Sequence, residues 1–293
     1  MRFIPLILLC SLGFHELAAQ EVAFTKRPTQ VNDTSHQKLV GNLVANRTIR
    51  QHKQIVDSSK QTLVRNQDRH LTVLEMANGV PVRAKLVYGN SATVVKAEQR
   101  DQVEVTQPVA GNTYLVLKRG DELLFGDETG QPVTEEEAKV LNLHMSAFGK
   151  PNPLAEFLNG KRIRVGQSIE VPKEVAIELL GLTGREGNTD RLVLRLRATK
   201  VHDRAEYAVF ETILKTSGGE TAMAMLMKGE LVVETGTCRT KSIQLEGPIS
   251  MSEVRGPTEG RFSVDTNGTL QLTVQTEFAR STSVASAKPT TTR

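Results

Sequence analysis

The histidines and acidic runs are the first places in this chain where chemistry could reside. His70 stands beside Asp68 and Arg69, and Glu135, Glu136 and Glu137 could serve as paired carboxylates in acid–base catalysis. However, three glutamates at the start of a helix are explained by its positive dipole end, and a solvated strand entrance explains the His70 group equally well. We therefore expect no catalytic residue and interpret the chain as a non-enzyme.

Motifs of metal, nucleotide and hydrolase sites do not occur at the required spacing. There is no Gly-x-Ser-x-Gly elbow and no phosphate-binding Gly-x-x-x-x-Gly-Lys-Ser/Thr loop. The residues Asp265 to Gly268 match the start of a calcium loop, but Thr276 stands where that loop needs glutamate. No two histidines after residue 19 are close in sequence: His36, His52, His70, His144 and His202. The expectation is no metal and no cofactor.

Three methionines offer the best candidate surface for a ligand. Met223, Met225 and Met227 alternate along an expected strand, and methionine adapts to irregular apolar shapes. They are therefore speculative ligand-binding residues for an apolar, lipid-like molecule. The alternative is a strand face that a helix or the rest of the protein covers.

The elements that must position these residues are mostly strands. Apolar and polar residues alternate with a period of two along 222–247, with breaks predicted at Lys228-Gly229 and Thr235-Gly236. Asn-Gly pairs predict hairpin turns at Asn78-Gly79 and Asn267-Gly268, and a further hairpin is expected over 113–125. Residues 41–69 fit a strand or a helix.

Two short helices interrupt this pattern. A capping-box spacing from Thr134 to Glu137 opens the first, whose apolar stripe ends before Gly149, and residues 173–180 form the second. Pro151 and Pro153, which follow the first helix, prevent it from continuing. The expected fold class is mainly β (α+β), with antiparallel meander sheets in two similar lobes and two short helices.

The expected organisation has five parts. They are a signal peptide at 1–19, a flexible lead-in at 20–45, an N-terminal β lobe with a C-terminal helix at 46–150, a C-terminal β lobe at 151–279, and a disordered tail at 280–293. Strand pairs precede runs of short strands in both lobes, a pattern that suggests internal duplication with a groove between the lobes.

Composition and the first residues indicate the compartment. An apolar run from Phe3 to Phe14 followed by a cleavage point after Ala19 is typical of an export signal, and is too short to span a bilayer. A lipoprotein signal ending at Cys10 is the alternative, although Leu8 and Leu9 precede it. Without Cys10, Cys238 is the only cysteine, expected to be buried and inert. The protein is thus expected to be exported, to the periplasm or the cell exterior.

The charge of the chain argues against nucleic acid as a partner. A net charge of +4 is spread along the chain, and there are only three tyrosines and no tryptophan for base stacking. No apolar stretch is long enough for a transmembrane span.

Several short phrases resemble those of known families. They are Gly160-Lys161-Arg162-Ile163-Arg164-Val165-Gly166, then Glu170-Val171-Pro172, Gly229-Glu230-Leu231 and Asp265-Thr266-Asn267-Gly268. In these the chain resembles, over roughly 64–278, uncharacterised exported bacterial β-rich families known as domains of unknown function. The resemblance implies two strand lobes and brings no catalytic residues. The function expected is binding or interaction at the cell envelope, with an unknown envelope protein or an apolar ligand as partner.

Overall fold

A computed structural model describes residues 20–52, 54–98, 100–180, 188–217, 223–256 and 260–279. The expected signal peptide, Cys10 and the expected C-terminal tail lie outside these residues.

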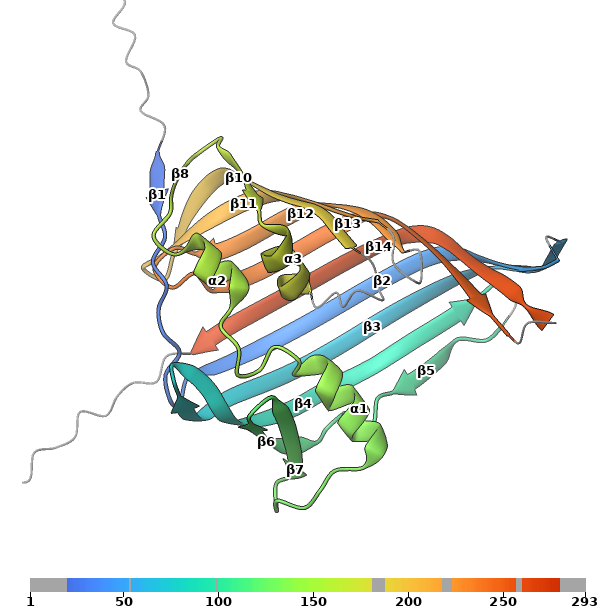
Figure 1. Ribbon diagram of the computed structural model, residues 1–293, viewed down its shortest axis with the longest axis horizontal. Helices are drawn as coiled ribbons and strands as arrows, with labels where there is room; N and C mark the ends of the chain where they lie inside the picture. Colours follow the sequence, from blue (N-terminus) through green and yellow to red (C-terminus); the bar gives the residue numbers. More distant parts are fainter. Residues whose placement is uncertain are drawn as a thin grey trace, which may run out of the picture.

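Most of the chain forms one antiparallel sheet of twelve strands (Figure 1). Its order is β7-β6-β4-β3-β2-β14-β13-β12-β11-β10-β9, with β5 also on β4. The strands are β2 (Thr34–Gln51), β3 (Gln54–Ala77), β4 (Val80–Ala97), β5 (Val103–Thr106), β6 (Thr113–Arg119), β7 (Glu122–Asp127), β9 (Ser168–Val171), β10 (Asn188–His202), β11 (Ala205–Ser217), β12 (Ala224–Glu234), β13 (Thr240–Arg255) and β14 (Phe262–Ala279). This meander confirms the mainly β fold class and shows that residues 41–51 and 54–69 are strand.

The two halves of the chain share this sheet. The last strand, β14, pairs with β2 from Ala279↔Thr34 to Phe262↔Gln51, so the C-terminal strand lies in the middle of the sheet. The separate sheets expected for two lobes are therefore replaced by one continuous sheet. The prediction of a flexible lead-in is wrong for residues 34–45, because these residues belong to β2, which hydrogen-bonds to β14 on one side and β3 on the other.

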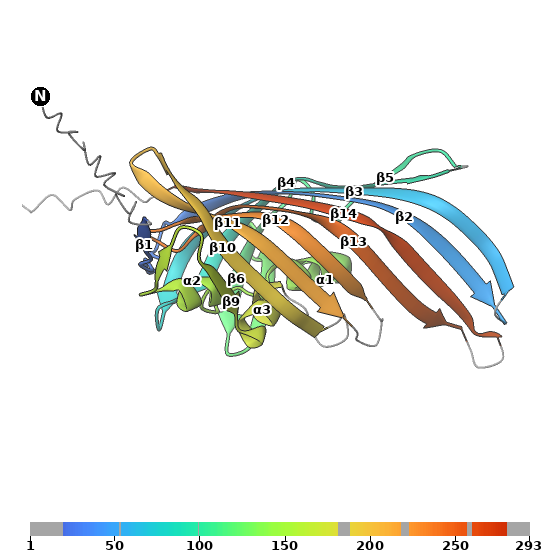
Figure 2. The ribbon, with the colours of Figure 1, turned by 90° about the horizontal axis from the view of Figure 1, so that it is seen from above.

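The helices all lie on the concave side of the curved sheet (Figure 2). They are α1 (Glu135–His144), α2 (Pro153–Leu158) and α3 (Lys173–Leu180). A small second sheet pairs β1 (Glu21–Ala23) with β8 (Arg162–Arg164). The far ends of β2, β3, β13 and β14 extend past the helices, and no helix of the described residues lies over them (Figure 2).

The capping box predicted for the first helix is present. The Thr134 side chain accepts a hydrogen bond from the Glu137 backbone N–H, and the Glu137 carboxylate accepts one from the Thr134 N–H. The predicted second helix is α3, but α2 was not expected. Pro153 begins α2 rather than only ending the preceding helix. Asn152 caps α2, and the N–H that a proline lacks at the first position would have no helical partner.

Of the two predicted Asn-Gly turns, one is right. Asn78 and Gly79 have φ of 50° and 78° and connect β3 to β4, as a two-residue hairpin turn requires. Asn267 and Gly268 instead lie inside β14, paired with strands on both sides. The predicted break at Lys228-Gly229 is wrong in the same way, because β12 runs through it.

Three glycines allow adjacent strands to approach closely on the concave side. A Cβ atom built on Gly229, Gly247 or Gly268 would lie less than 3.0 Å from a backbone oxygen of the next strand: Gln244, Leu226 and Val44 respectively. Real Cβ atoms do not come that close, so only glycine fits there. These positions let the sheet curve around the helices.

Two hydrophobic clusters fill the concave side. In the N-terminal cluster, Leu141 of α1 and Met145 and Phe148 of the turn after it pack against β4 and β6. In the C-terminal cluster, α2 and α3 pack on β10, β11 and β12, around Leu158, Leu194 and Phe210. In the part of the chain that the structure describes, no helix has both the length and the apolar character to cross a bilayer.

Candidate functional site

A pocket of about 620 Å³ lies on the concave side, where the two hydrophobic clusters meet. We call it the inner pocket. Leu71, which packs on the N-terminal cluster, lines it together with Ala155 and Cys238 of the C-terminal cluster. Its size is within the range typical of small-molecule sites.

The strap formed by residues 24–33 forms one wall of the inner pocket. Its backbone N–H groups donate hydrogen bonds to Lys161, Thr235 and Thr237, and Asn32 and Asp33 bond to Val73 of β3. The strap thus links the region around α2, the β12–β13 turn and the end of β3. These backbone hydrogen bonds hold in place a segment that lies outside regular secondary structure.

The lining of the inner pocket is amphipathic. Its apolar residues come from the strap, the sheet, the segment before α2 and α2 itself: Pro28, Leu71, Val73, Val80, Pro81, Pro151, Ala155 and Phe278. Its charged residues are Lys26, Arg27, Lys150 and Arg239 against Asp33 and Glu156. Cations therefore outnumber carboxylates around an apolar interior.

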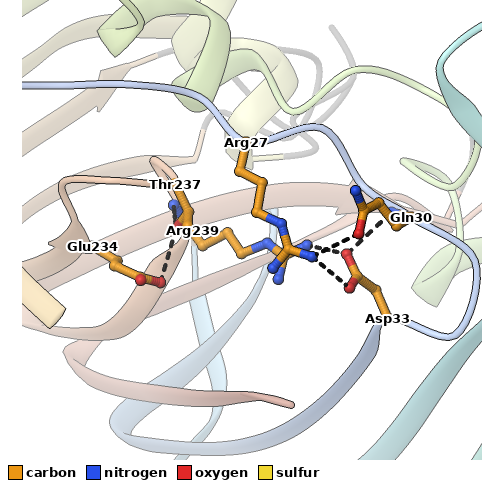
Figure 3. Close-up of polar contacts among 6 residues, drawn as sticks. All are labelled: Arg27, Gln30, Asp33, Glu234, Thr237 and Arg239. Atoms are coloured by element: carbon orange, nitrogen blue, oxygen red, sulfur yellow. Dashed lines mark hydrogen bonds and ion pairs between the residues drawn. The ribbon is translucent and has the colours of Figure 1, made fainter. Parts of the chain in front are cut away.

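A single buried carboxylate joins two of these cations. Asp33, whose side chain is 5% exposed, forms ion pairs with Arg27 of the strap and with Arg239, the residue directly before β13 (Figure 3). Its Oδ2 also accepts a hydrogen bond from the Gln30 N–H at 3.1 Å. The Arg239 side chain is only 13% exposed and its guanidinium lies 4.9 Å from the Phe278 ring centre. Two guanidinium charges on one carboxylate leave a net positive charge beside an apolar wall.

The β12–β13 turn places Arg239. The N–H groups of Thr237 and Cys238 both donate to the Glu234 carbonyl, and Cys238 has a positive φ of 54°. The Thr237 hydroxyl donates to the Glu234 carboxylate at 2.8 Å (Figure 3). Cys238 is buried, as expected, and burial raises the pKa of its thiol to about 11.

A second polar group attaches α1 to the sheet. His144, at the end of α1, accepts a hydrogen bond from Arg65 at its Nε2, while its Nδ1 lies 2.8 Å from the Tyr88 hydroxyl. Arg69 donates to the His144 carbonyl and to the Gln37 side chain, which lines the inner pocket. Burial first, then the charges of Arg69 and Arg65, lower the pKa of His144 to about 4. His144 is therefore neutral at pH 7.

Acid is expected to weaken the fold through His144. The folded pKa lies below the ordinary 6.5, so the unfolded chain takes up a proton first as the pH falls. Stability is full above about pH 6.5 and is lost down to about pH 4. Between pH 7 and 4.5 the wild type should lose about 2 kcal/mol more than His144→Gln, after allowance for solvent screening. Urea unfolding across this pH range measures the difference.

The exposed His202 provides the control for that titration, since His202→Gln should follow the wild-type curve. Parallel pH curves for the wild type and His144→Gln would contradict the assignment of this acid sensitivity to His144.

The structure separates the residues singled out in the sequence. Met227 is 2% exposed within the C-terminal cluster and Met225 packs against that cluster, so these two lie on a covered strand face. None of Met223, Met225 and Met227 lines the inner pocket. Glu137 belongs to the helix cap, as the dipole interpretation of the acidic run implied.

Sequence reasoning missed the residues that make the inner pocket charged. Asp33 and Arg239 are 206 positions apart, and no local motif links them. The only sequence signal was a cluster of turn-forming and charged residues before β2, which we interpreted as a flexible segment.

Comparison with known proteins assigns no family. No family model matches the chain, and no curated protein matches it. Among solved structures, one titled "Lipid-protein interactions in lipovitellin" aligns with a TM-score of 0.39 and 10% identity over 87% of this chain. Another, the crystal structure of MucB in complex with MucA(peri), aligns with a TM-score of 0.11 and 12% identity, over 80% of this chain and 88% of that one. The chain spans about a quarter (26%) of the lipovitellin chain. At these TM-scores neither likeness assigns a fold or a ligand.

Proposed function

We propose that this chain is a binding protein for a small amphipathic anion, an apolar chain with a carboxylate or phosphate head, held in the inner pocket. The observation that carries the proposal is the pairing of Arg27 and Arg239 with one buried carboxylate, Asp33, at the edge of an apolar pocket. An anionic head beside Arg239 would balance the remaining charge. The apolar chain would lie against Leu71, Val73 and Val80.

The electrostatic part of the proposal follows from the cost of burying charge. A partly buried guanidinium that lacks a full counter-charge is unfavourable in a low-dielectric site. Arg239 gains a partner in Asp33 and contacts the face of Phe278, but it shares that partner with Arg27. A bound anion would gain more free energy here than at an exposed lysine.

We also propose that the protein binds its ligand without converting it, and that it works outside the cytoplasm with an envelope protein as partner. The high pKa of Cys238 supports binding over covalent catalysis, because the thiolate is the nucleophilic form. The signal-like residues 1–19 support export. Kinship with the uncharacterised exported families is part of the same proposal.

Charge reversal at Lys150 tests the proposal without disturbing the buried ion pairs. Lys150 is an exposed cation that lines the inner pocket. Lys150→Glu should weaken dodecanoate binding about fivefold to tenfold, because a nearby negative charge replaces a positive one in partly screened surroundings. Isothermal titration calorimetry measures the change.

The matched control is Lys96→Glu, which reverses an exposed charge on β4 outside the pocket and should leave the affinity unchanged. Dodecyl phosphate in place of dodecanoate shows which head group binds more tightly, and dodecanol shows the contribution of the apolar chain alone. Equal losses in Lys150→Glu and Lys96→Glu, or equal affinity for dodecanol and both anions, would contradict an anion site in the pocket.

A further inference from the structure

Two histidines far apart in the sequence face each other on the convex side of the sheet. His36 of β2 and His70 of β3 are direct cross-strand partners, with their rings stacked at a centroid distance of 3.8 Å. Their neighbours Gln37 and Arg69 face the concave side, so alternation along the strands places both histidines on the opposite face. This pair is therefore separate from the inner pocket.

Asp68 completes a three-residue group with the two histidines. Its Oδ1 lies 2.7 Å from His36 Nε2 and 3.8 Å from His70 Nε2. One ligand atom from each of the three residues can be chosen so that all lie within 4.8 Å of one another. Asp68 and His70 are two residues apart on β3, and His36 lies directly opposite His70 on β2. All three side chains are therefore on one face of the sheet.

The three side chains are of the kinds that bind zinc. Imidazole and carboxylate groups are both zinc ligands, and in tetrahedral coordination their ligand atoms lie about 3.3 Å apart. The distances of 2.7 Å and 3.8 Å from Asp68 to the two rings bracket that value. On binding, the stacked rings would turn out of their parallel arrangement so that both Nε2 lone pairs point at one ion.

We propose that His36, Asp68 and His70 bind a divalent transition-metal ion, with Zn²⁺ as the ion that fits this ligand set. The side chains are 23%, 30% and 54% exposed respectively, so the ion can enter from solvent and water can supply the fourth ligand. Glu277 of β14 lies directly opposite His36 and provides a second carboxylate on the same face. In the sequence, His70 stands out beside Asp68 but His36 does not, because only the register of β2 and β3 brings the two histidines together.

Zinc titration of the chain without a histidine tag tests the proposal. After removal of metal with a chelator, isothermal titration calorimetry with ZnCl₂ should show one ion bound per chain. His36→Gln and His70→Gln should each weaken zinc binding more than tenfold, since even loss of a residue that only supports a ligand costs that much. Circular dichroism confirms that the variants retain the β fold.

The control is His202→Gln, which removes an exposed histidine on β10 and should leave zinc affinity unchanged. In crystals soaked with zinc, the anomalous signal should lie between His36, Asp68 and His70. No saturable binding by the wild type, or equal affinity in the wild type, His36→Gln and His70→Gln, would overturn the proposal.

Discussion

Replacing Gly229 by alanine should lower the free energy of unfolding by about 3 kcal/mol, because the added methyl group has no room beside β13. The new Cβ would lie less than 3.0 Å from the Gln244 carbonyl oxygen and carbon, which belong to backbone that cannot rotate away. To make room, β12 and β13 would have to separate at this point. Urea unfolding followed by circular dichroism measures the loss.

Gly41 offers a matched control within the same sheet. It lies in β2, has an ordinary strand conformation, and a Cβ atom there would meet nothing within 4 Å. Gly41→Ala should therefore be neutral or slightly stabilising, since alanine reduces the entropy of the unfolded chain. Equal stability of Gly229→Ala and Gly41→Ala would show that the close strand approach does not limit the fold.

Asp33→Asn should change stability and ligand affinity in opposite directions. The substitution removes the carboxylate that Arg27 and Arg239 share, and should lower the free energy of unfolding by about 3 kcal/mol because two partly buried cations lose their counter-charge. The pocket becomes more positive, so dodecanoate should bind about tenfold more tightly. Urea unfolding and calorimetric titration of the same variant measure the two effects.

An exposed ion pair provides the control for Asp33. Glu253 pairs with Arg255 far from the pocket, and Glu253→Gln should change stability by less than about 0.5 kcal/mol with no effect on ligand affinity. Weaker dodecanoate binding by Asp33→Asn, despite a retained fold, would mean that Asp33 itself contacts the ligand rather than limiting the positive charge.

Local rules predicted those parts of the fold that depend on a few neighbouring residues. The Thr134 cap and the Asn78-Gly79 turn were predicted because each requires only a short sequence with a defined backbone conformation. Asn267-Gly268 has the same sequence but lies inside β14, where Ala45 of β2 approaches the glycine. A glycine needed for close strand approach looks like a turn glycine until the neighbouring strand is known.

The sites could not be predicted because they depend on strand order. The pairing of β14 with β2 joins the two halves of the sheet, and Asp33 of the strap then lies beside Arg239. The register of β3 with β2 places His70 opposite His36. Neither arrangement leaves a local motif. The methionine face was predicted as a strand face, but which side chains a helix covers depended on where α2 and α3 pack.

The apolar part of the ligand is proposed to contact the wall of the inner pocket, and the fluorescence of a single tryptophan placed there can detect this contact. The chain contains no tryptophan, so Val80→Trp places the only indole at the pocket wall and Val254→Trp places one at the exposed far end of β13. Titration with bromine-substituted dodecanoate, which quenches tryptophan on contact, should quench Val80→Trp saturably and leave Val254→Trp unchanged. Equal quenching of both proteins, or none in Val80→Trp while calorimetry shows binding, would place the ligand elsewhere and contradict the proposed function.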